Sequence, residues 1–191
     1  MRLARGAAGA LIALAVLTGC SSKAPANDTL PSAAPTSADA SETLPPLGPP
    51  DFPMPAEARA QTPAGAEAFL RYYIGLYNAA QESMDTRYLK QFGRACDTCI
   101  GLSNQLEEDA KAGYRYQGGD VIVNGISPPL TRRSEAEIAF SITQAALTLT
   151  TASGEPVEDL SFPEKKNPAC GAILSWSPTT SSWAMTQWDV G

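Results

Sequence analysis

Histidine is absent from the 191 residues of this chain. Histidine is the usual general base near neutral pH, the partner of serine or cysteine nucleophiles, and a ligand in nearly every familiar catalytic zinc site. Its absence excludes these chemistries. No Gly-rich phosphate loop lies between a strand and a helix, so nucleotide binding has no support either. The sequence therefore predicts no cofactor and no metal.

Basic clusters are also lacking. The chain has 14 basic against 20 acidic residues, a formal net charge of −6, and its adjacent basic pairs are Arg132-Arg133 and Lys165-Lys166. Nucleic acids and anionic lipid headgroups attract proteins through clustered Lys and Arg side chains. We therefore expect no nucleic-acid partner and no electrostatic adhesion to lipid.

Long hydrophobic runs are absent beyond the N-terminus. Arg2 and Arg5 precede an apolar run from about Ala7 to Leu17, which is too short to span a hydrocarbon core of about 30 Å and is typical of an export signal. The run ends in Leu17-Thr18-Gly19-Cys20, which resembles the lipobox of bacterial lipoproteins. In that class Cys20 is lipidated and residues 1–19 are removed. We therefore expect a lipid-anchored protein that faces outside the cytoplasm.

Residues 20–61 differ in composition from the rest of the chain. They contain more than half of the 16 prolines, together with many Ala, Ser and Thr residues and almost no aromatic ones. Such a segment buries too little apolar surface to offset its chain entropy, which predicts a disordered tether. A single domain is expected over residues 62–191.

This domain opens with helix signals. Thr62 is typical of an N-cap and Pro63 of a first helical position. Apolar residues at helical spacing then continue to Tyr77, which predicts an aromatic-rich buried stripe. A short second helix is expected over 84–92, and a third after Cys99 that stops at Gly113.

After Gly113 the apolar period becomes alternating, as in strands. Gly118-Gly119 predicts a bend or bulge within the first strand region. Residues 135–150 alternate, but the buried parity changes near Gln144, which predicts a bulge in one long curved strand. A short strand is expected over 157–162, then a loop at 163–168, and a closing hairpin with Trp176 and Trp183 on its two arms.

Helices followed by antiparallel strands indicate an α+β class, with the helices packed in a strongly curved sheet. The layout resembles the cone-shaped fold of the ketosteroid-isomerase and nuclear-transport-factor-two superfamily. It is also similar to a group of uncharacterised actinobacterial cell-envelope lipoproteins that share a domain of unknown function. The segments that carry this resemblance are TPAGAEAFLRYYIGLYNAA, CDTC, GGDVIV and the terminal LSW…W. It implies a fold and a location, and no reaction.

The motif Cys96-Asp97-Thr98-Cys99 has several interpretations. If Cys20 carries lipid, three cysteines remain, and three thiols without histidine do not complete a four-ligand structural zinc site. An oxidising compartment favours disulfides. A Cys96–Cys99 bond is the favoured interpretation, and a bond from either residue to Cys170 is the alternative.

Three functions remain open from the sequence. The preferred one is a lipid-anchored binding domain for an envelope protein or a small apolar ligand. The second is an isomerase- or cyclase-like enzyme that uses a pocket inside the cone, with candidate side chains at Tyr73, Tyr77, Tyr116, Asp85 and Asp120. The third is a thiol-disulfide oxidoreductase that uses the Cys96–Cys99 pair. No residue is assigned a catalytic role.

Overall fold

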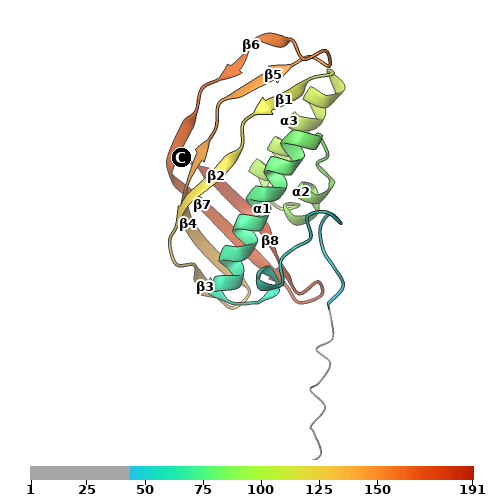
Figure 1. The fold of residues 1–191 in the computed structure, drawn as a ribbon. Coiled ribbons are helices and arrows are strands. Elements are labelled where there is room, and N and C mark those ends of the chain that lie inside the picture. Colours follow the sequence, from blue (N-terminus) through green and yellow to red (C-terminus); the bar gives the residue numbers. More distant parts are fainter. Residues whose placement is uncertain (1–43) are drawn as a thin grey trace, which may run out of the picture. The chain divides into compact units, whose positions relative to one another are not determined.

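The computed structural model describes residues 44–191, and helices precede strands in it (Figure 1). A single-turn 3₁₀ helix, η1, spans Ala56–Arg59 and is followed by α1 (Pro63–Ser83), α2 (Arg87–Phe92) and α3 (Asp97–Lys111). The remaining elements are strands. The predicted α+β order is therefore confirmed.

The α1 helix begins where its sequence signals place it. The Thr62 hydroxyl oxygen accepts a hydrogen bond from the Gly65 N–H at 3.0 Å, and Pro63 occupies the first turn. The helix ends at Ser83, and its C-cap residue Met84 has a φ of 58°, which lies in the left-handed region. The predicted apolar stripe is buried; it includes Ala66, Phe69, Leu70, Tyr73, Ile74 and Tyr77.

The next two helices begin at different residues from those expected. The predicted second helix starts at Arg87 and not at 84, because the left-handed Met84 ends α1 and the Asp85 carboxylate accepts from the Arg87 N–H. The third starts at Asp97, before Cys99. Its N-cap is Cys96, whose Sγ accepts a hydrogen bond from the Cys99 N–H at 3.2 Å.

Eight strands follow and form two antiparallel sheets. The strands are β1 (Arg115–Gly118), β2 (Val121–Ile126), β3 (Leu130–Arg132), β4 (Glu135–Gln144), β5 (Leu147–Thr150), β6 (Pro156–Phe162), β7 (Lys165–Ser177) and β8 (Ser182–Val190). The three-stranded sheet has the order β1-β5-β6, and the five-stranded sheet has the order β2-β4-β7-β8, with β3 paired to β4. The expectation of one strongly curved sheet is corrected, since the strands are divided between two sheets and neither is strongly curled.

Short connections join the strands of the two sheets, and we call the region that they form the crease. Two residues interrupt the path from β1 to β2, from β4 to β5 and from β6 to β7. Where β1 ends, Gly118 and the following Gly119 have φ values of 76° and 89°, which only glycine adopts without strain. The parity change predicted near Gln144 is confirmed, but it separates β4 from β5. The loop predicted at 163–168 is wrong from Lys165 onward, where β7 begins and pairs with β4.

The helices lie against one face of the five-stranded sheet (Figure 1). We call this the inner face and the opposite one the outer face. In β4 the inner positions Ala136, Ile138, Phe140 and Ile142 are buried, as the alternation predicts. The predicted closing hairpin is confirmed, because Trp176 in β7 pairs with Trp183 in β8.

Residues 44–61 also pack against this core. Arg59 donates hydrogen bonds to the carbonyl oxygens of Thr180 and Ser181 in the β7–β8 turn and to that of Pro45. Trp183 Nε1 donates to the Ala60 carbonyl at 2.9 Å. The compact part of the chain therefore extends further toward the N-terminus than the expected boundary at Thr62. Within residues 44–191, none of the helices is both long and apolar enough to cross a membrane.

Candidate functional site

The predicted Cys96–Cys99 disulfide is present at the start of α3. The two residues are 0% and 1% exposed. A Cβ added to Gly93, which ends α2, would lie 2.9 Å from the Cys99 Cβ and 2.2 Å from the Tyr73 hydroxyl oxygen. The disulfide is thus sealed beneath the α2–α3 connection. Thiol exchange needs an accessible sulfur, so this geometry supports a structural role and not redox catalysis.

Cys170 has no disulfide partner among the described residues, and it is buried on β7. It belongs to the hydrophobic core on the inner face. The alternative bond from Cys96 or Cys99 to Cys170 is therefore not formed. Cys20, the predicted lipidation site, lies outside the described residues.

Aromatic side chains occupy the space between α1 and the sheet. The Trp188 ring meets the rings of Tyr73 and Tyr77 edge-on, with centroid distances of 6.3 and 5.7 Å. Burial raises the pKa of Tyr77 to about 12 and raises that of Tyr73 as well. Both tyrosines therefore stay neutral at physiological pH and act as packing residues.

Tyr116, another candidate for proton transfer, has a partner that the sequence analysis missed. Its hydroxyl donates a hydrogen bond to Asp109 Oδ2 at 2.7 Å. Asp109 is 8% exposed and its other oxygen accepts from Gln105. Burial and this hydrogen bond raise the pKa of Tyr116. Since Asp109 lies on the α3 face that packs inward, one turn after the buried Leu106, helical spacing was the signal that could have found it.

The two remaining acidic candidates are Asp85 and Asp120. The Asp85 carboxylate forms an ion pair with Arg87 at 2.7 Å, and the hydrogen bond from that guanidinium holds the pKa of Asp85 below its usual value. Asp120 is exposed at the crease, where its carbonyl accepts from the Ala145 N–H. The structure therefore places Tyr73 and Tyr77 together against Trp188 and pairs Tyr116 with Asp109, whereas Asp85 pairs with Arg87.

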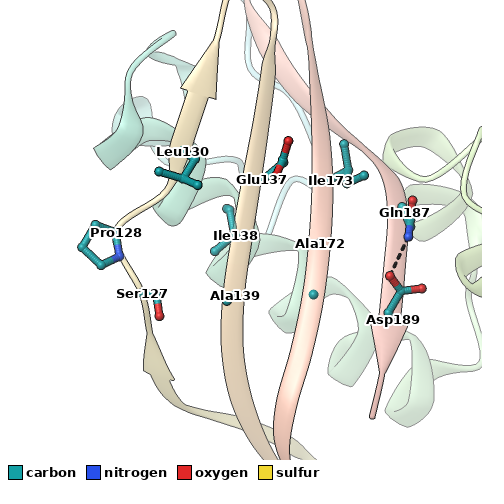
Figure 2. Close-up of a pocket in the computed structure, with 11 residues that line it drawn as sticks. Ser127, Pro128, Leu130, Glu137, Ile138, Ala139, Ala172, Ile173, Gln187 and Asp189 are labelled. Atoms are coloured by element: carbon teal, nitrogen blue, oxygen red, sulfur yellow. Dashed lines mark hydrogen bonds between the residues drawn. The ribbon is translucent and has the colours of Figure 1, made fainter.

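The outer face of the five-stranded sheet carries a hollow of ≈ 320 Å³ (Figure 2). It extends across four chain segments, from the β2–β3 connection over β4 and β7 to β8. Its floor is low because Ala139 and Gly171 are opposite each other in the β4–β7 register. The adjacent pair, Glu137 and Ile173, forms one wall, while Pro128 and Leu130 close one end.

Two carboxylates border this hollow, which we call the outer-face hollow. Glu137 stands on β4 and Asp189 on β8, and both are exposed. Asp189 Oδ2 accepts a hydrogen bond from Gln187 Nε2 (Figure 2). None of the residues that line the hollow is basic. The hollow is therefore shallow, partly apolar and acidic at its border.

A second hollow, of ≈ 580 Å³, adjoins the first and shares Ser127 and Ala139 with it. It lies beside two β-bulges, at Val123/Gly125 in the β2–β4 pair and Phe140/Ile142 in the β4–β7 pair. Bulges twist strands locally and re-aim their side chains. No charged residue lines this second hollow.

Comparison with known families identifies the chain. A model described as a family of unknown function, DUF6318, matches residues 35–189. The chain belongs to this family. No curated protein matches it. Among solved structures, the intermembrane space region of the chloroplast protein ARC6 is similar, with 16% identity, a TM-score of 0.49, and coverage of 68% of this chain and 95% of that one.

In this member of the DUF6318 family, the outer-face hollow is the candidate site, because two exposed carboxylates border it and no basic residue lines it. The sequence does not indicate this hollow, for a physical reason. Glu137 and Ala139 lie on the solvent-facing side of β4, and the alternation along this strand indicates only which residues are buried. Only the register of β4, β7 and β8 places Ala139, Gly171 and Asp189 in one row.

Proposed function

We propose that this protein is a lipid-anchored, extracytoplasmic binding domain that engages a protein of the cell envelope through the outer-face hollow. The signal-like N-terminus and Cys20 support the anchor, as does the resemblance to cell-envelope lipoproteins. The mature chain would retain 12 of its 14 basic residues against 20 acidic ones, because Arg2 and Arg5 leave with the signal.

One observation favours a protein, and not a small molecule, as the partner. The space beneath α1 is filled by Tyr73, Tyr77 and Trp188, whereas the outer face is open and hollowed. Enclosed, mostly apolar clefts suit small molecules, and shallow open surfaces suit proteins. The filled interior gives less support to a small apolar ligand or to an isomerase-like enzyme.

Site-specific crosslinking in the native envelope tests the binding surface. A photoreactive amino acid would replace Leu130, which is 61% exposed at the end of the hollow, and a matched one would replace Phe162, which is 50% exposed in the three-stranded sheet. We expect a discrete crosslinked product from position 130 and none from position 162. Equal products from both positions, or none from 130, would contradict the proposal.

Fractionation tests the anchor separately. Cys20→Ser removes the thiol that would take the lipid, so the variant should leave the membrane fraction while keeping the same fold. Two acyl chains are needed for stable attachment, which makes the expected change nearly complete. A chain that stays in the membrane fraction without Cys20 would refute lipid anchoring at this residue.

A further inference from the structure

We propose that the partner docks on the outer-face hollow with an extended segment that carries two basic side chains, one paired with Glu137 and one with Asp189. This inference rests on the proposed function, since it names the chemistry of the partner at the same surface.

The two carboxylates have no cation of their own. Four ion pairs are formed within residues 44–191, and neither Glu137 nor Asp189 takes part in any of them. The Gln187 amide that contacts Asp189 carries no charge. The border of the hollow is therefore negative without internal compensation, and charge complementarity favours a basic occupant.

The spacing of the carboxylates determines how the charges must be arranged. Glu137 and Asp189 stand two strands apart and one row apart in the register. With strands about 4.8 Å apart and same-face residues about 6.7 Å apart, their Cα atoms are separated by about 12 Å. Two carboxylates provide too few ligands for Ca²⁺, which takes about six to eight oxygens, and residues 44–191 contain no group of three or more His, Cys, Asp or Glu residues that could hold a metal ion. Residues three or four positions apart in an extended peptide span about the same distance.

The floor between the carboxylates suits long basic side chains. Ala139 and Gly171 present at most a methyl group, and Ile173 adds a half-buried apolar surface beside them. Arg and Lys place their methylene stems on apolar surface and keep the charged end in water. The hollow thus offers room for the stems, and its carboxylates receive the charged ends.

Charge argues against a second copy of this chain as the occupant. The formal net charge is −6, so two copies repel each other over distances comparable to the Debye length. None of the residues that line the hollow is an arginine or lysine that could pair with the carboxylates of a second copy. A partner with basic character is the better complement.

A labelled peptide tests the inference on the full-length chain purified from membranes. The probe is a glycine-serine peptide with two arginines four positions apart, and its control has citrulline in place of both arginines. Binding is followed by fluorescence anisotropy at low ionic strength. The double variant Glu137→Gln/Asp189→Asn is compared with Glu155→Gln/Glu158→Gln, which removes the same charge at exposed positions in and beside β6.

We expect the wild-type chain to bind the arginine peptide and not the citrulline peptide, with affinity that falls as salt is added. The Glu137/Asp189 variant should bind about tenfold more weakly, since each exposed pair contributes up to about fivefold. The Glu155/Glu158 variant should bind as the wild type does. Equal binding by both variants overturns the inference.

The crosslink from Leu130 distinguishes failure of this inference from failure of the proposed function. If it forms in the native envelope and persists unchanged in the Glu137→Gln/Asp189→Asn chain, the surface binds a protein but the basic segment is refuted. If no crosslink forms, both proposals fail together. A crosslink that is lost in the double variant supports both.

Discussion

The ring of Trp188 meets that of Tyr77 at a right angle, with 5.7 Å between the centroids. Trp188 comes from β8, the last strand, and Tyr77 from α1, so the contact joins elements that are far apart in the sequence. Edge-to-face pairs stabilise a core beyond the apolar area that they bury. Here they also close the interior where a ligand pocket was an alternative.

Trp188→Ala should therefore destabilise the protein strongly. Removing a fully buried tryptophan costs about 3–5 kcal/mol, because the cavity that remains is only partly refilled. Urea unfolding measured by circular dichroism gives the change in free energy. Ile122→Ala, on a side chain that is 58% exposed in β2, is the control and should change stability by less than about 0.5 kcal/mol. A similar loss in both variants would contradict the role of Trp188 in closing the core.

The disulfide should resist reduction in the folded protein and should stabilise it modestly. Cys96 and Cys99 are both almost fully buried, so dithiothreitol should reduce them only after denaturant is added. The loop that they close is very short, and Cys96→Ser/Cys99→Ala should lower the free energy of unfolding by about 2 kcal/mol. Serine at position 96 keeps an oxygen able to cap α3. Rapid reduction without denaturant would indicate an exposed, exchange-active pair instead.

Arg59 should hold residues 44–61 against the β7–β8 turn. Its guanidinium donates to three carbonyl oxygens, and Arg59→Ala should cost about 1–2 kcal/mol in unfolding free energy. Arg59→Lys should restore little, because an ammonium lacks the planar fork that reaches several acceptors. The control Arg71→Ala removes an exposed pair with Glu67 and should be nearly neutral. Full rescue by lysine would mean that charge alone matters.

Glu107 should make stability depend on pH. Its carboxylate forms an ion pair with Lys90 at 2.6 Å, which joins α3 to α2. The hydrogen bond from Lys90, followed by that from Thr86, lowers the pKa of Glu107 below its usual 4.5. The contribution is therefore present above pH 4.5 and is lost as the pH falls through the lower pKa of the folded state. Both side chains are more than a third exposed, so it amounts to less than about 1 kcal/mol.

Glu107→Gln measures this contribution. The difference in unfolding free energy between this variant and the wild type should be largest near pH 7 and should vanish in acid. Glu108→Gln, at an exposed neighbouring position outside the ion pairs of residues 44–191, should show no such dependence. A difference that stays constant from pH 7 to acid would show that packing, and not ionisation, explains the effect of Glu107.

Local patterns in the sequence predicted most of the elements. The cap at Thr62, the aromatic stripe through Tyr77 and the alternation from Ala136 to Ile142 depend on neighbours along the chain, so they could be recognised without a structure. The helix and strand boundaries that were predicted wrongly depend on tertiary contacts. The residues from Lys165 onward look like a polar loop, yet they form a strand because β4 provides their hydrogen bonds.

By itself the sequence determined the α+β order, the absence of histidine chemistry and the spacing that allows the Cys96–Cys99 bond. These follow from composition and from short-range geometry. Only the tertiary structure decided that Trp188 fills the interior, that the strands form two sheets, and that Glu137 and Asp189 border one hollow. Such relationships arise from strand register, which joins residues dozens of positions apart and leaves no mark on the local pattern of either strand.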